Sequence, residues 1–315
     1  MEHRILVPEV VAACGLDKLL SQGVEVKTTS SIKKEDLIHD LQDCDGVIVR
    51  VAKMDAEVLA ANPQLKIIGK HGVGVDNIDL DYCREHGIRV VFTPHANTQS
   101  VAEHAVTLML ACAKQINHKA ACYREEEYAV KDRMLGNEVS GKILGLIGFG
   151  NIGSKVARMA HYGFNMTVLA YDPFLEEGLR GDGVEVTHDA ERVYRQADFI
   201  SVHTPATKST IKSVGKAQFR WMKNTAFIVN TSRGTVIDEL ALIQALREGE
   251  IAGAGLDVSD PEPARKDNPL HGMANVIMTP HCAGVTRDSM DNMSRDVATG
   301  IIEVLSGKAP TWPVV

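Results

Sequence analysis

A glycine-rich turn near the middle of the chain most constrains the fold. Gly148-Phe-Gly150-Asn-Ile-Gly153 directly follows the apolar run at residues 142–147 and opens an amphipathic segment. A strand that passes through such glycines into a helix begins a βαβ unit that binds a dinucleotide. There Gly148 permits a tight turn, Gly150 lets the backbone approach a pyrophosphate, and Gly153 allows close packing of helix on strand. The turn therefore predicts a parallel sheet with a nucleotide cofactor, the alternative being a purely structural turn.

An acidic residue ends the next predicted strand. Asp172 follows residues 167–171, and Pro173 and Phe174 come after it, so no arginine stands beside the carboxylate. A carboxylate about 20 residues beyond the glycines accepts hydrogen bonds from the adenosine ribose and repels a 2′-phosphate. This position favours NAD over NADP.

Short apolar runs alternate with amphipathic segments on both sides of the glycine turn, which predicts two parallel sheets. Strands are expected at residues 4–7, 24–28, 46–49, 66–69 and 88–92, and then at 142–147, 167–171, 199–202, 226–230, 251–256 and 276–278. Helices are expected between them, at 10–22, 33–41, 55–62, 80–86, 152–163, 189–196 and 238–248. Two longer helices, at 99–117 and 287–306, bracket the second sheet. We therefore expect one domain from residues 1–98 and 288–315 and another from residues 99–287.

Composition narrows the functional classes. The 315 residues include 34 Lys and Arg and 41 Asp and Glu, a formal net charge of −7, without a basic block. Nucleic acid and anionic membranes attract basic surfaces, so neither is expected as a partner. The six cysteines are dispersed and form no C-x-x-C pair, so we expect reduced thiols, no metal site and a cytoplasmic protein without a signal peptide.

Unusual polar residues follow three predicted strands of the second sheet. Arg233 comes after residues 226–230, Glu262 after 251–256, and His281 after 276–278. Each alone is explained as an ordinary loop residue. Because ligands of open α/β sheets bind at the carboxyl ends of the strands, their joint occurrence beyond a nucleotide motif indicates an active site.

Several segments occur in an order and spacing typical of one family. They are 71–79, Ser100-Val-Ala-Glu-His104, the glycine turn, His203-Thr-Pro205, Asn230-Thr-Ser-Arg-Gly234, Pro261-Glu-Pro263 and Thr279-Pro-His281. In these the chain resembles the D-isomer specific 2-hydroxyacid dehydrogenases. The resemblance implies an α/β protein of two doubly wound parallel-sheet domains, a Rossmann NAD domain inserted into a discontinuous flavodoxin-like substrate domain. It also implies an NAD-dependent oxidoreductase that moves a hydride between nicotinamide and a small anionic D-2-hydroxy or 2-keto acid.

The residue types suit the roles that the resemblance implies. His281 can exchange the hydroxyl proton near neutral pH, Glu262 would orient its ring and favour imidazolium, and Arg233 can clamp the substrate carboxylate. The backbone around Val73 and Gly74 is expected to bind the same carboxylate. Cofactor contacts are expected from Gly148, Gly150, Asn151, Ile152, Gly153, Asp172, His203, Pro205, Thr231, Asp257 and Gly284.

Two basic residues bear on which 2-hydroxy acid is the substrate. Arg50 follows the strand at 46–49, and Lys70 precedes the glycine loop at Gly72. Both resemble basic positions of phosphoglycerate dehydrogenases and suit a second anionic group, which favours 3-phosphoglycerate and 3-phosphohydroxypyruvate. If both are ordinary solvated charges, a hydroxypyruvate or glyoxylate reductase or a D-lactate-type dehydrogenase is the alternative.

The resemblance also bears on class and assembly. Some relatives are NAD-sensing corepressors, so a non-catalytic binding protein is a less favoured alternative. Family members pair through their NAD domains, and we expect a homodimer that uses an arm at residues 120–139, with Tyr123 and Tyr128. At 315 residues we expect the catalytic unit without an appended regulatory domain of about 100 residues.

Overall fold

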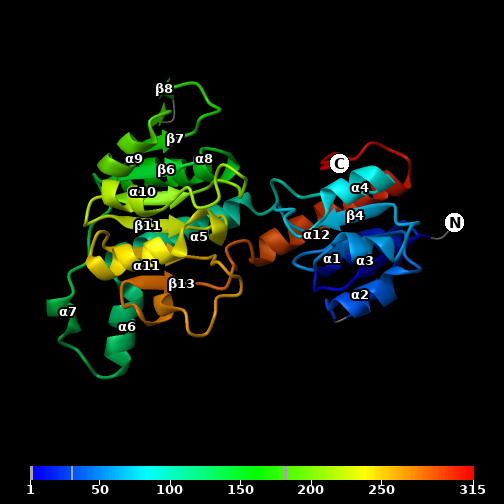
Figure 1. Ribbon diagram of the computed structural model, residues 1–315, viewed down its shortest axis with the longest axis horizontal. Coiled ribbons are helices and arrows are strands. Elements are labelled where there is room, and N and C mark those ends of the chain that lie inside the picture. Colours follow the sequence, from blue (N-terminus) through cyan, green and yellow to red (C-terminus); the bar gives the residue numbers. More distant parts are fainter. Residues whose placement is uncertain (1–2, 30, 181–182) are drawn as a thin grey trace. The chain divides into compact units, whose positions relative to one another are not determined.

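The computed structural model describes residues 3–29, 31–180 and 183–315, and their contacts divide the chain into two compact units (Figure 1). Unit 1 comprises Met1–Thr98 with Gly284–Val315, and unit 2 comprises Gln99–Ala283. The return into unit 1 thus falls at Gly284, a few residues before the expected position 288. A continuous unit is inserted into one built from both ends of the chain.

Unit 1 holds a five-stranded parallel sheet. Its strands are β1 (Arg4–Val7), β2 (Glu25–Thr28), β3 (Gly46–Val49), β4 (Ile67–Lys70) and β5 (Arg89–Val91). Their spatial order is β2-β1-β3-β4-β5, the flavodoxin-like order. After β2 the chain returns to the other side of β1, so β1 and β3 flank a switch point where the carboxyl ends of strands favour ligands.

The helices of unit 1 cover this sheet. They are α1 (Ala13–Ser21), α2 (Lys34–Leu41), α3 (Ala56–Ala60), α4 (Leu80–His86) and α12 (Arg287–Leu305). The side chains of Val297 and Ile301 on α12 lie directly over Gly69 of β4, where a Cβ atom would come within 2.6 Å of Val297. The C-terminal helix therefore completes the core over the N-terminal strands.

Unit 2 holds an eight-stranded sheet of Rossmann type. Its strands are β6 (Ile143–Ile147), β7 (Thr167–Tyr171), β8 (Gly178–Leu179), β9 (Val184–Thr187), β10 (Phe199–Val202), β11 (Phe227–Asn230), β12 (Gly253–Leu256) and β13 (Val276–Met278). The order is β13-β12-β11-β10-β6-β7-β9-β8, parallel except for the β8–β9 pair. The switch point lies between β6 and β10. This topology confirms the expected fold class, although the sequence patterns had not indicated β8 or β9.

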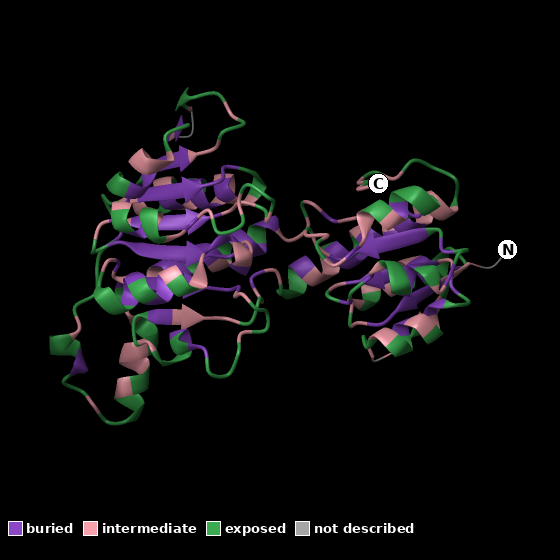
Figure 2. Cartoon of the chain, viewed as in Figure 1, coloured by how far each residue is buried: buried purple, intermediate pink, exposed green. Residues whose placement is uncertain are grey.

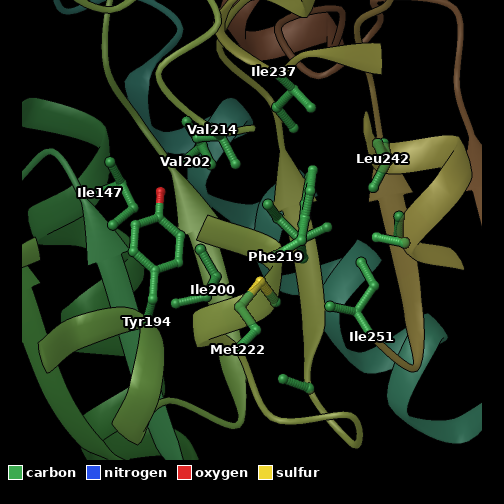
Figure 3. Packing of buried hydrophobic residues seen from close by; sticks show 14 of the residues in the cluster. Ile147, Tyr194, Ile200, Val202, Val214, Phe219, Met222, Ile237, Leu242 and Ile251 are labelled. Carbon is green, nitrogen blue, oxygen red and sulfur yellow. The ribbon is translucent and has the colours of Figure 1, made fainter. Parts of the chain in front are cut away.

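The helices of unit 2 leave most of the sheet buried (Figure 2). They are α5 (Thr98–Lys114), α6 (Ile116–Arg124), α7 (Val130–Arg133), α8 (Asn151–Arg158) with a π-helical turn at Met159–Gly163, α9 (Ala190–Gln196), α10 (Lys216–Trp221) and α11 (Glu239–Glu248), with short 3₁₀ turns at Gly234–Val236 and Pro269–Gly272. Figure 3 shows one side of the core, where Phe219 and Met222 pack near Ile200 and Tyr194. Phe219 is fully buried.

The long helix predicted at 99–117 ends earlier than expected. Gln115 takes a left-handed conformation with φ of 54°, and α6 starts after it. The Ala113 carbonyl accepts a hydrogen bond from Asn137 N–H at 2.7 Å, so the returning chain takes an acceptor at the end of α5. The segment with α6 and α7 forms an arm at one side of unit 2 (Figure 1).

None of the helices in the described part of the chain combines the length and apolar character that a membrane span requires.

Candidate active site

The glycine turn lies at the switch point of unit 2, between β6 and α8. Gly148 has φ of 96°, and a Cβ atom there would come within 2.9 Å of the His203 carbonyl oxygen. A Cβ atom on Gly153 would lie 2.5 Å from the Gly148 carbonyl oxygen. Both positions therefore exclude a side chain, because the turn is packed against the loop after β10 and against itself.

The space beside this turn suits a phosphate group. A Cβ atom on Gly150 would meet no atom of the described residues within 4 Å, so a ligand can approach the backbone there. Asn151 and Ile152 form the first turn of α8, whose N–H groups and helix dipole favour an anion. The hydroxyl oxygens of Thr204 and Thr231 are buried and have no hydrogen-bond partner among the described residues. Buried hydroxyls rarely stay unpaired, so these atoms fit polar groups of a bound dinucleotide.

The backbone fixes the carboxylate of Asp172. Oδ2 accepts a hydrogen bond from Phe149 N–H and Oδ1 one from Phe174 N–H, each at 3.0 Å. Phe149 belongs to the glycine turn, so Asp172 is tied to the place where a pyrophosphate would sit. The residue is half-buried, and the carboxylate retains acceptor capacity for ribose hydroxyls.

His203 flanks the opposite side of the switch point. Its Nε2 atom lies 2.9 Å from Ser201 Oγ. Burial lowers the pKa of the His203 ring to about 4, so the ring is neutral at pH 7. His203 and the exposed Pro205 therefore offer an uncharged surface next to the turn.

The proposed catalytic residues follow three neighbouring strands. Arg233 comes after β11, Glu262 after β12 and His281 after β13, and these strands are adjacent in the sheet. Nδ1 of His281 lies 2.5 Å from Oε1 of Glu262. Both side chains are partly exposed, at 44% for His281 and 37% for Glu262. The pair is therefore formed and reachable by a small molecule.

The loop that carries Arg233 is shaped by Asn230, the last residue of β11. The buried Asn230 amide donates to the Arg233 carbonyl oxygen at 2.9 Å, and its oxygen accepts from Ser232 N–H at 2.9 Å. Arg233 Nη1 donates to the Ser232 carbonyl oxygen at 2.8 Å. These contacts fix the backbone of the loop from which the Arg233 side chain extends.

Asp257 anchors the turn that carries His281. Its carboxylate is fully buried and accepts hydrogen bonds from Cys282 N–H at 3.0 Å, Ala283 N–H at 2.8 Å and the Thr279 hydroxyl at 2.5 Å. The Asp257 carbonyl oxygen also accepts His281 N–H at 2.8 Å. The resemblance implied only a cofactor contact for Asp257, whereas the structure shows that Asp257 also stabilises the turn at residues 279–283.

Two polar residues beside Asp257 were not singled out from the sequence. Nε2 of His104 lies 3.0 Å from Thr279 Oγ1 and 3.5 Å from Asp257 Oδ1. Both residues belong to motifs that carried the family resemblance, Ser100–His104 and Thr279–His281. Membership of these motifs was the one sequence signal that could have marked them as site residues.

A carboxylate in unit 1 occupies the switch point between β1 and β3. Glu9 accepts the backbone N–H groups of Arg50 at 2.7 Å, Val51 at 3.0 Å and Ala52 at 3.0 Å. Successive N–H groups of this kind form an anion-binding nest, and here the protein's own side chain fills it. Arg50 Nη1 donates to the Val10 carbonyl oxygen at 3.1 Å, so the guanidinium lies over the same segment.

Lys70 does not present a solvated charge. The residue is 7% exposed, and its ammonium donates to the Arg50 carbonyl oxygen and to Asn77 Oδ1, the latter at 2.6 Å. These contacts favour a structural role for Lys70, in which its ammonium ties the backbone at Arg50 to the end of β4.

The glycine loop after β4 is held by a threonine. Gly72 N–H donates to Thr93 Oγ1 at 3.1 Å, and Val73, the next residue, is 37% exposed. The loop with Val73 and Gly74 therefore stays accessible while its base is fixed.

Gly284 lies at the start of the returning chain, where a Cβ atom would fall 3.0 Å from Asn97 Nδ2.

Comparison with known proteins supplies the family. The model of the NAD-binding domain of D-isomer specific 2-hydroxyacid dehydrogenases matches residues 106–283, which lie within unit 2. The chain belongs to the D-isomer specific 2-hydroxyacid dehydrogenase family. Its resemblance to this family, inferred from sequence motifs, is thereby confirmed, and unit 2 contains the family's NAD-binding domain.

Individual members of the family are similar over nearly the whole chain. The D-3-phosphoglycerate dehydrogenase of Archaeoglobus fulgidus is 40% identical over 96% of this chain and 58% of its own length. The glyoxylate reductase of Korarchaeum cryptofilum is 37% identical over 98% of this chain and 95% of its own length. A crystal structure of a Thermus thermophilus protein has a TM-score of 0.92 at 34% identity, covering 99% of this chain and 100% of that one. The chain thus spans little more than half the length of several phosphoglycerate dehydrogenases that it matches.

Proposed function

We propose that the protein is an NAD-dependent dehydrogenase that interconverts a D-2-hydroxy acid and the corresponding 2-keto acid. The His281–Glu262 pair carries this proposal, because an imidazole held by a carboxylate can transfer a proton, and the pair follows β12 and β13, which come next in the sheet to the strand that precedes Arg233. Unit 1 would serve as the substrate-binding domain and unit 2 as the cofactor domain.

The dinucleotide would be held by the turn at Gly148, Gly150 and Gly153 and by Asp172. The open space at Gly150 supports this placement, as does the unpaired hydroxyl of Thr204, whose methyl group lies beside Gly148. Bound NAD would accept or supply the hydride. The carboxylate of Asp172 would discriminate against a 2′-phosphate by charge repulsion.

The remaining chemistry falls to the protein's own side chains. His281 would donate a proton to the carbonyl oxygen during reduction, or accept it from the hydroxyl during oxidation, through Nε2, because Nδ1 faces Glu262. Glu262 would hold the ring in position. Arg233 would bind the substrate carboxylate. Under the same proposal, the backbone N–H groups at Val73 and Gly74 would also serve substrate binding.

For the substrate, we favour 3-phosphoglycerate and 3-phosphohydroxypyruvate. The similarity to the Archaeoglobus dehydrogenase supports this choice, as does Arg50 at the switch point of unit 1. Lys70 lends less support, since its ammonium is committed to Arg50 and Asn77. Hydroxypyruvate or glyoxylate is the second candidate, favoured by the Korarchaeum reductase and by the negative charge of Glu9 beside Arg50.

A substrate panel tests both levels of the proposal. Oxidation of NADH would be followed with 3-phosphohydroxypyruvate, hydroxypyruvate, glyoxylate and pyruvate, and the acids ranked by kcat/KM. We expect turnover, with 3-phosphohydroxypyruvate ranked first. A higher rank for hydroxypyruvate or glyoxylate would select the second candidate. Absence of turnover with every acid would contradict the dehydrogenase assignment.

We further infer a cytoplasmic homodimer. All six cysteines are free thiols, which suits a reducing compartment. The arm with α6 and α7 exposes Ile116, Tyr123, Tyr128 and Leu135, with exposed fractions between 55% and 77%. Tyr128→Glu combined with Leu135→Asp should convert the dimer to a monomer in analytical ultracentrifugation, and an unchanged mass would contradict this interface.

A further inference from the structure

Three potential metal ligands meet beside the turn that carries His281. They are His104 on α5, Asp257 after β12 and Cys282 after β13, and one ligand atom from each lies within 4.8 Å of the others. The sequence offered no sign of this group, because its members are far apart in the chain and follow no metal-binding spacing. We propose that these three side chains form a site for one thiophilic divalent cation, such as Zn²⁺, that inhibits the enzyme.

The distances already approach those of a zinc site. Asp257 Oδ1 lies 3.5 Å from His104 Nε2 and 3.6 Å from Cys282 Sγ. Ligand atoms around a tetrahedral zinc ion are about 3.3–3.6 Å apart, given bond lengths of about 2.0–2.3 Å. Only the separation between His104 and Cys282 must shorten, and both are side chains with rotatable bonds.

Charge and access agree with this assignment. A carboxylate, a thiolate and a neutral imidazole together carry two negative charges, which one divalent cation neutralises at a place where Asp257 is fully buried. His104 and Cys282 are only half-buried, so an ion can reach the site from solvent. The fourth position would be taken by water or remain open, as in catalytic zinc sites.

Binding exchanges two hydrogen bonds for metal bonds and leaves the fold intact. Nε2 of His104 would give up its contact with Thr279 Oγ1, 3.0 Å away, to bind the cation. The Cys282 thiol now donates to Asp257, and a bound cation would take the place of that hydrogen. Thr279 and the N–H groups of Cys282 and Ala283 can keep their hydrogen bonds to Asp257. Such outer contacts orient metal ligands in established sites.

Inhibition follows from the position of the site. Cys282 directly follows His281, and the separation between His104 and Cys282 must shorten on binding, so a cation there would shift the turn that carries the His281 ring. It would also occupy the Asp257 carboxylate, which is one of the cofactor contacts that the family resemblance implies, so the inhibitory part of this inference rests on the proposed function.

Binding can be measured without any substrate. Co²⁺ added to the full-length protein should produce a near-ultraviolet thiolate-to-cobalt band that saturates at one ion per chain and disappears when Zn²⁺ is added. Cys282→Ser should abolish the band, and His104→Gln should weaken Co²⁺ binding at least tenfold. Circular dichroism and thermal melting would establish that both variants fold.

Cys122→Ser is the matched control. Cys122 also lies near a histidine, with Sγ 3.6 Å from His118 Nε2, but this pair is not part of the cluster. The band should persist in Cys122→Ser. A band that is absent in the parent protein, that survives Cys282→Ser, or that is lost in Cys122→Ser would overturn the site.

Enzyme assays then test the inhibitory part. Zn²⁺ should inhibit turnover of the parent and of Cys122→Ser at the same concentration, whereas Cys282→Ser should need at least tenfold more. Equal sensitivity of all three proteins would overturn inhibition through this site. The cobalt measurement does not depend on turnover, so failure of the dehydrogenase assignment and failure of the metal site are distinguishable.

Discussion

Nδ1 of His281 lies 2.5 Å from Oε1 of Glu262, although the two residues come from different strand ends. The contact uses one ring nitrogen and leaves Nε2 for a second partner. His281 has φ of 49°, a backbone conformation uncommon for residues other than glycine. The Asp257 carbonyl oxygen stabilises it by accepting His281 N–H. The ring is thus held from both its side chain and its backbone.

Loss of this ring should remove proton transfer but leave cofactor binding intact. His281→Gln should lower kcat by about 10²–10⁴-fold, since general acid–base catalysis contributes that much. Glu262→Gln should lower it less, because the imidazole remains. NADH affinity, measured by fluorescence, should change less than twofold in both. His271→Gln, at an exposed histidine of the same unit, is the control and should retain full kcat; a loss of NADH binding in His281→Gln would contradict its role.

Asp172 should determine both the affinity and the choice of cofactor. Asp172→Ala removes the two acceptors that hold Phe149 and Phe174, and should weaken NADH binding at least tenfold. Asp172→Asn keeps an acceptor but loses the charge, so NADPH should bind relatively better than it does to the parent. Titration of both cofactors checks this. An unchanged NADPH/NADH ratio in Asp172→Asn would exclude charge repulsion as the basis of selectivity.

The side chain of Arg50 should distinguish the two candidate substrates. Arg50→Ala should raise KM for 3-phosphohydroxypyruvate at least tenfold more than KM for hydroxypyruvate, because only the former carries a phosphate. Arg50→Lys should recover part of the difference. Lys53→Ala, at a 78% exposed cation close by in the chain, should affect neither substrate. Equal changes for both acids in Arg50→Ala would argue against phosphate recognition.

Glu9 should stabilise unit 1 through its three backbone contacts. Glu9→Ala leaves the N–H groups of Arg50, Val51 and Ala52 without their acceptor and should lower the free energy of unfolding by about 2–3 kcal/mol. Glu57→Ala removes a 71% exposed carboxylate and should change stability by less than about 0.5 kcal/mol. Urea unfolding measures both. Similar values for the two variants would show that the nest contributes little.

His71 should make stability depend on pH. Burial lowers the pKa of this ring from 6.5 to about 4, so between these pH values the unfolded chain binds a proton that the folded chain does not. Stability should be constant above pH 6.5 from this source and should fall by up to about 3 kcal/mol as the pH drops toward 4. His71→Gln should reduce that fall, and His39→Gln, at an exposed histidine, should not. Identical pH dependence in His71→Gln and the parent would contradict this source.

Local sequence signals predicted much of the fold. They indicated the strands of unit 1, the glycine turn, and the strands that precede Arg233, Glu262 and His281. Contacts that depend on which strands become neighbours were not predictable. Glu9 meets Arg50 because β3 lies beside β1. The buried Lys70, on the neighbouring strand β4, finds an acceptor for its ammonium in the Arg50 carbonyl oxygen. The break at Gln115 was missed because the helical pattern continues past it, while the Asn137 contact at the end of α5 is tertiary. For the same reason the approach of His104 and Cys282 to Asp257 could not be predicted, although His104 lies in a motif that carried the family resemblance.

The insertion of a continuous unit into a split one has a consequence for synthesis on the ribosome. Strands β1–β5 emerge first, yet the apolar face over Gly69 is covered by Val297 and Ile301 on the last helix. The inserted unit is contiguous, so it can close on itself while the N-terminal strands still expose that face. We expect the part of the chain that is made first to be the last to become protected from proteases and chaperones.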